Sequence, residues 1–91
     1  MKRPTSYLAI VLINAGSSYA TASSMRLALD RVADIIKRDW GSTYNVAGAE
    51  MIANIYDASG VEDMHWDHSG AYNTKTGERL HKIGERHIKI P

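Results

Sequence analysis

Residues 22–40, ASSMRLALDRVADIIKRDW, decide the fold, because their pattern predicts one long helix. Their apolar residues recur at steps of three and four, which places them on one side of an α-helix. These residues are Met25, Ala28, Leu29, Val32, Ile35, Ile36 and Trp40. Charged residues fill the other side, where Asp34 precedes Arg38 by one helical turn, the favourable order for an ion pair. The apolar side requires a sheet to cover it.

The ends of this helix carry start and stop signals. Thr21 or Ser23 is expected to cap the first turn, because a hydroxyl oxygen accepts hydrogen bonds from free amide groups there. Gly41 follows the last apolar residue, at the position where helices often end through a left-handed residue. The sequence therefore predicts an amphipathic helix over 22–40.

Length and composition limit what the rest of the chain contributes. The chain has 91 residues, which fits a single domain over 1–91 with a modest core. It has no cysteine, which excludes disulfides, thiolate catalysis and thiolate metal sites. No run approaches the ~20 apolar residues of a membrane span, so we expect a cytoplasmic protein without a membrane partner. A small core also leaves room for a homodimer, in which a second copy adds burial.

The amino-terminal segment has two readings. Met1-Lys2-Arg3 followed by an apolar run resembles a secretory signal, but that run is short and ends at Asn14. We instead predict a strand over Tyr7 to Ile13, apolar on both faces, whose second face is covered by another helix or a second protomer. Residues 14–21 are predicted to be a connecting loop. Its Gly16-Ser17-Ser18 lacks the glycine and lysine spacing of phosphate-binding loops.

The segment 46–57 fits two periodicities. A helix places Glu50, Asn54 and Asp57 on one polar stripe and is the preferred prediction, while a strand remains the alternative. From Met64 to Asn73 the residues alternate and predict one strand, followed by a hairpin loop with Gly77 at a positive φ. A return strand over 78–83, a turn at Gly84 and a strand over 86–90 complete a meander.

The predicted architecture is a small two-layer α/β (α+β) domain. Its elements follow the order β-α-α-β-β-β, and a mostly antiparallel sheet packs against the helix over 22–40.

A protein-binding surface is the leading functional prediction. Between Asp39 and Lys75 the chain holds acidic residues but no lysine or arginine, and aromatic residues lie among them. Tyrosine and tryptophan dominate interface hot spots, so this region is a candidate docking face for a basic partner. The expected partner-binding residues are Tyr56, Glu62, Asp63, Trp66 and Tyr72. No catalytic or cofactor motif is found, which favours a non-enzymatic inhibitor such as phages and other mobile elements use against host defence complexes.

Nucleic-acid binding is the first alternative. The carboxy-terminal segment is rich in basic residues, and a β-surface of this kind can bind phosphates. The residues expected to do so are Lys75, Arg79, Lys82, Arg86 and Lys89. Glu78 and Glu85 dilute the positive charge, and the pI of about 8.1 lies below the range typical of nucleic-acid modules.

A metal-dependent hydrolase is the second alternative. His65 and Asp67 share one face of a strand, so they become a metal site only if His81 or His87 joins them from a neighbouring strand. No cofactor is otherwise indicated.

Overall fold

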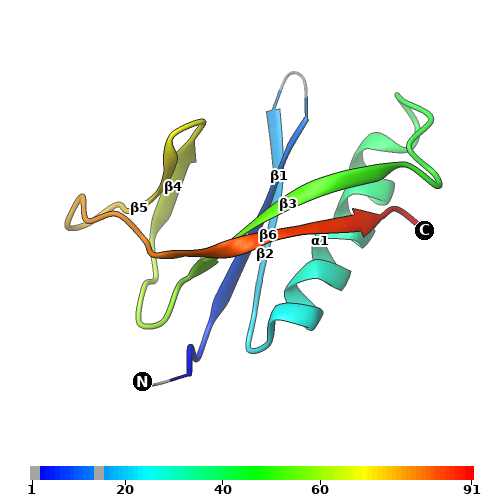
Figure 1. The fold of residues 1–91 in the computed structure, drawn as a ribbon. Helices are drawn as coiled ribbons and strands as arrows, with labels where there is room; N and C mark the ends of the chain where they lie inside the picture. Colours follow the sequence, from blue (N-terminus) through cyan, green and yellow to red (C-terminus); the bar gives the residue numbers. More distant parts are fainter. Residues whose placement is uncertain (1–2, 14–15) are drawn as a thin grey trace.

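The computed structural model describes residues 3–13 and 16–91 and shows one helix packed on a four-stranded antiparallel sheet, with a separate two-stranded sheet. The strands are β1 (Tyr7–Ile13), β2 (Gly16–Ala22), β3 (Glu50–Asp57), β4 (Met64–Asp67), β5 (Gly70–Asn73) and β6 (Lys82–Lys89), and the helix is α1 (Met25–Trp40). The large sheet has the order β2-β1-β3-β6. Figure 1 shows α1 at one end of the molecule and the β4–β5 hairpin at the other. The two-layer α/β prediction is confirmed.

Helix α1 forms where the sequence predicts it, with different ends. Ser24 is the N-cap, and its Oγ accepts from the backbone N–H of Leu27, so the predicted caps Thr21 and Ser23 are wrong. The chain is still in a strand until Ala22, which delays the first turn. Gly41 has a right-handed φ of −64°, since its N–H continues the helical bonding to the Lys37 carbonyl. The prediction of a left-handed residue there is also wrong.

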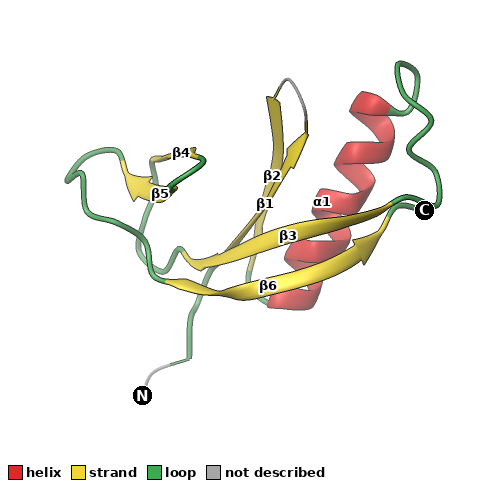
Figure 2. Cartoon of the chain, turned by 45° about the horizontal axis from the view of Figure 1, so that its top comes forward, coloured by secondary structure: helices red, strands yellow, loops and turns green. Residues whose placement is uncertain are grey.

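The helix side of the sheet holds the larger core. Val32 and Ile36 of α1 are completely buried against small strand residues, among them Ala9 and Ala53. Figure 2 shows α1 lying along one side of the large sheet. Small side chains on the strands allow the helix to approach closely, and burying its apolar side supplies most of its stability.

Residues 16–22 form strand β2, so the prediction of a loop over 14–21 is wrong for its described part; residues 14–15 lie outside the described residues. The strand pairs with β1 from Ala22 opposite Tyr7 to Gly16 opposite Ile13. Its Ser18 and Ala20 are buried while Tyr19 and Thr21 are exposed. This alternation is carried by small side chains, which look like loop residues in the sequence.

Residues 50–57 are strand β3, so the preferred helix over 46–57 is wrong and the alternative strand is confirmed over this part. The register places Ile55 opposite Ala9 and Tyr56 opposite Leu8. Ala53 joins the core under α1, whereas Tyr56 joins a second core on the opposite face. A strand apolar on both faces loses clean alternation, and its composition then resembles a helix.

The second core explains what covers the other face of β1. Leu8 and Ile10 pack there with Leu80 and with Trp66 of β4. The cover is therefore a β-hairpin and its following loop, rather than the predicted helix or second protomer.

The carboxy-terminal half contains more turns than predicted. Residues 64–73 form a hairpin, not one strand, because Asp67 accepts a hydrogen bond from the Ser69 backbone and Gly70 takes a φ of 149°. Gly77 has the predicted positive φ of 72°. Of the predicted return strand over 78–83, Arg79 forms one bridge with Tyr72, and Lys82 and Ile83 belong to β6. Gly84 lies inside β6, so the predicted turn there is wrong. The element order β-β-α-β-β-β-β replaces the predicted β-α-α-β-β-β.

Candidate docking surface

The face of the large sheet opposite α1 is only partly covered. The hairpin β4–β5 lies over Leu8 and Ile10, but farther along the same face Leu12, Tyr19 and Ile52 are 53%, 51% and 50% exposed. Half-exposed large apolar side chains are ordinary when scattered singly. Here all three lie on the same face of the sheet.

Strand register and the alternation of side chains place these residues on one face. Ile10 of β1 lies opposite Tyr19 of β2 on one side and Asn54 of β3 on the other. Leu12 lies diagonally across from Tyr19, within reach of side-chain contact. On β3, Ile52 lies on the same face two residues beyond Asn54, where the pairing of β1 with β3 has ended. The three residues, which we call the apolar strip, cross β2, β1 and β3.

A hollow lies at the β2 end of the apolar strip. It has a volume of about 330 Å³ and is lined by Tyr19, Glu62, Asp63, Met64, Trp66 and Thr74. Trp66 is anchored there because its Nε1 donates to Ser17 Oγ over 2.9 Å and its ring packs on Tyr19, with centroids 4.5 Å apart. The hollow therefore combines an ordered aromatic pair with two exposed carboxylates.

The predicted partner-binding residues meet different outcomes. Glu62, Asp63 and Trp66 come together in this hollow. Tyr72 lies on β5, where it stacks with His65 at a centroid distance of 5.2 Å. Tyr56 is only 7% exposed, so its predicted exposure is wrong. It faces the second core because β4 and β5 fold over this end of the sheet, which the sequence pattern does not reveal.

The apolar strip itself was missed by sequence reasoning. Tyr19 lies in the predicted loop over 14–21, and Ile52 lies in the predicted helix over 46–57. The available signal was Leu12, because a strand with apolar residues on both faces needs cover along its whole length.

The basic residues of the nucleic-acid alternative do not form one surface. Lys75 lies 3.5 Å from Glu62, and Lys82 lies 2.8 Å from Glu85. Arg79 donates to the Ser69 carbonyl and lies over the Tyr72 ring. These cations have partners within the chain.

Strand register separates the remaining basic residues further. Arg86 lies opposite Ala53, whose side chain is in the core under α1, and Lys89 lies opposite Glu50. Successive residues of a strand alternate between faces, so Arg86 and Lys89 point to opposite sides of the sheet.

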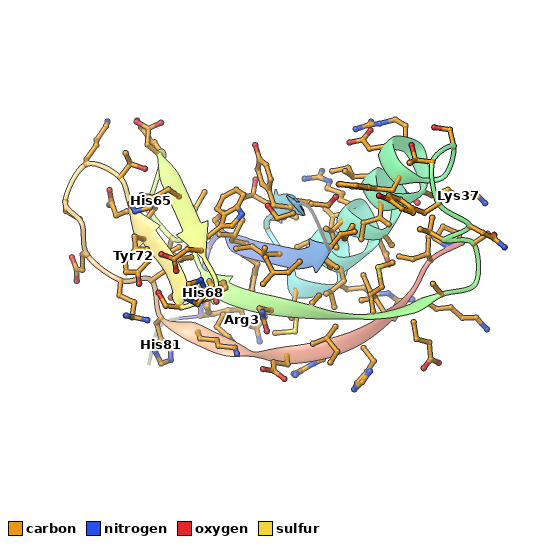
Figure 3. The ribbon with its side chains drawn as sticks, turned by 90° about the horizontal axis from the view of Figure 1, so that it is seen from above. Arg3, Lys37, His65, His68, Tyr72 and His81 are labelled. Atoms are coloured by element: carbon orange, nitrogen blue, oxygen red, sulfur yellow. The ribbon has the colours of Figure 1, made fainter. Side chains whose placement is uncertain are left out.

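The histidine and aspartate of the metal alternative have other contacts. His65 Nδ1 lies 3.3 Å from Thr74 Oγ1. The pKa of Asp67 is lowered because the Ser69 hydroxyl and backbone donate hydrogen bonds to its carboxylate. Figure 3 shows His65, His68 and Tyr72 together on the hairpin, while Lys37 lies far away on the helix. Across residues 3–13 and 16–91, no three histidine, aspartate or glutamate side chains gather to hold a metal.

Comparisons with known proteins give no information about the function. No protein-family model, curated protein or solved structure matches this chain. Within the part of the chain that the structure describes, no helix is long and apolar enough to cross a membrane.

Proposed function

We propose that this protein is a non-enzymatic binding module that occupies a basic and apolar surface of a protein partner. The observation that supports this proposal most directly is that the apolar strip adjoins the hollow around Trp66. Tyr19 belongs to both. An interface with an aromatic centre and a charged rim has the usual anatomy of a protein–protein contact.

The negative charge of the hollow favours a partner with a basic side chain. Glu62 and Asp63 are exposed beside the Tyr19 and Trp66 rings. A lysine or arginine of a partner can form ion pairs with the carboxylates and cation–π contacts with the faces of the rings. The Lys75 contact with Glu62 is between exposed side chains, and such pairs contribute little free energy, so a partner's cation can replace it.

Inhibition is the mode of action that we propose. A chain of 91 residues that binds through one face acts by blocking whatever its partner surface normally engages. We place it in the class of phage or mobile-element inhibitors of host defence complexes, acting in the cytoplasm. This placement rests on size and on the lack of a catalytic motif.

Affinity purification from lysate of the source cell tests the proposal. The bait is the wild-type chain or the double variant Leu12→Lys, Ile52→Lys, each purified with and without nuclease. Leu27→Lys is the matched control, since Leu27 is also an exposed leucine, at 39%, but lies on α1. We expect one stoichiometric protein that survives nuclease, is retained by the control and is lost with the double variant. Retention that disappears with nuclease contradicts the proposal.

A further inference from the structure

The two outer strands of the large sheet differ in how they are protected from pairing. β6 carries charged residues along its length and has a register shift opposite Ile55 and Tyr56, two features that discourage another strand from adding to an edge. β2, at the opposite edge, reads GSSYATA and has neither charge nor proline. β2 is the unprotected edge.

The outward backbone groups of β2 can be assigned from one contact. Arg31 Nη1 donates to the Thr21 carbonyl over 2.9 Å, so the backbone of Thr21 faces away from β1. Backbone direction alternates along an antiparallel strand, so the N–H and C=O groups of Tyr19 and Ser17 face outward as well. Within residues 3–13 and 16–91, no hydrogen bond reaches these outward groups of Ser17 and Tyr19.

A groove runs beside this free edge. It has a volume of about 550 Å³ and is lined by Ser17, Ser18, Tyr19, Ile35, Arg38, Asp39, Trp40 and Thr43. Trp40 is fixed at its side because its Nε1 donates to Ser18 Oγ over 2.9 Å. One wall is therefore a strand with free backbone groups, and the other is a helix that offers the apolar Ile35 and the exposed Arg38.

We propose that this groove binds an extended peptide segment with acidic residues at its ends, which adds to the sheet as a strand beside β2. Main-chain hydrogen bonds to Ser17 and Tyr19 supply the pairing. Arg31 and Arg38 lie at the two ends of the free edge and are both exposed, which favours carboxylates there. Arg38 Nε also contacts the neighbouring Asp39 carboxylate over 3.0 Å, but both side chains are exposed and such a pair contributes little free energy, so a peptide carboxylate can share the guanidinium. The groove lies on the outer edge of β2 and shares Tyr19 with the hollow, but its proposed occupant differs from the partner proposed above.

Charge disfavours a second copy of this chain as the occupant. Antiparallel pairing of two β2 strands about Tyr19 places Thr21 of one copy opposite Ser17 of the other. Arg31 lies at the Thr21 end of β2, and Arg38 lies at the Ser17 end. Arginine would then face arginine at both ends of the interface, and like charges repel.

Amide NMR titration tests the groove. The probe is a nine-residue peptide of alternating threonine and valine with glutamate at both ends, and the matched probe carries lysine at both ends. We expect the glutamate peptide to shift the amides of Ser17 and Tyr19 and to slow their hydrogen exchange. Arg38→Glu should weaken the glutamate peptide about fivefold and improve the lysine peptide, because the charge of the wall is reversed.

A pair of substitutions isolates the backbone contribution. Ser17→Pro removes the outward N–H, at an edge position where proline is tolerated. Ser17→Ala keeps that N–H and loses the same hydroxyl. Binding that is lost in Ser17→Pro and kept in Ser17→Ala supports the proposal. It is overturned by equal binding of both peptides, by shifts centred on Leu12 and Ile52, by no binding, or by a dimer formed through β2 without peptide.

Discussion

Trp66 Nε1 lies 2.9 Å from Ser17 Oγ, and this hydrogen bond joins the β4–β5 hairpin to strand β2 across 49 residues of sequence. The same indole packs on Tyr19. The bond therefore holds in place one wall of the hollow that the proposed partner enters, so we expect it to affect both stability and the proposed binding.

Graded substitution of Trp66 separates these two roles. Trp66→Phe keeps a ring against Tyr19 but loses the N–H, so we expect about 1 kcal/mol of destabilisation. Trp66→Ala also removes packing from a half-buried site and should cost about 2 kcal/mol. Urea denaturation measures both. Equal stability of the two variants would contradict the contact with Tyr19.

A second indole, Trp40, is predicted to be coupled to Ser18. Trp40 Nε1 donates to Ser18 Oγ, and Ser18 is only 4% exposed. Trp40→Phe leaves a buried hydroxyl without its donor and should cost about 1–2 kcal/mol. In the double variant with Ser18→Ala the cost should be smaller than the sum of the single costs. Additive free energies of unfolding would show that the two side chains do not interact.

Truncation should destabilise the fold much more at a core residue than at a residue of the apolar strip. Ile36 is completely buried, so Ile36→Ala should cost about 3 kcal/mol through lost burial and a cavity. Leu12 is 53% exposed, and Leu12→Ala should cost less than about 1 kcal/mol. Denaturation of both variants checks this, and a large loss for Leu12→Ala would mean that the apolar strip is structural.

Acid should destabilise the fold through carboxylates with lowered pKa values. The pKa of Asp57 lies below its usual 3.8 because the Ser59 side chain and backbone donate to it, and the pKa of Glu85 lies below 4.5 because Lys82 does. A carboxylate with a lowered folded pKa stabilises the fold above its unfolded pKa. That contribution is lost as pH falls through the folded pKa.

Thermal melts between pH 6 and pH 2 measure this effect. The melting temperature should decline most steeply below about pH 4.5, and Asp57→Asn should flatten the decline. Asp30→Asn is the control on the exposed side of α1. If the melting temperature of Asp57→Asn declined with acid as steeply as that of the wild type, the Asp57 carboxylate would not be a cause of the decline.

Helix α1 and strand β1 were predictable because each carries its signal in local periodicity. The three- and four-residue recurrence in α1 survives in the structure with only its first turn shifted. β2 was not predictable in the same way, because Ser18, Ala20 and Ala22 are small enough to be read as loop. Their burial depends on α1, which is a tertiary contact.

The candidate site was predictable only in part for a related reason. Glu62, Asp63 and Trp66 are close in sequence, and charge and aromatic content identify them together. Tyr19 joins them because it packs on Trp66 from strand β2, and Ile52 shares the open face of the sheet only because residues 50–57 form a strand. Lys82 and Glu85 show the same limit: three residues apart, they would face opposite sides of a regular strand, but the register shift beside Ile83 brings them to one side.

Site-specific photo-cross-linking in source cells tests the central claim most directly. A benzophenone amino acid replaces Ile52 in the apolar strip or, as the control, the exposed Lys37 on α1. The proposed function predicts one adduct with a single protein from position 52 and none from position 37. Adducts with nucleic acid, or the same protein captured equally from both positions, would contradict binding through the open face of the sheet.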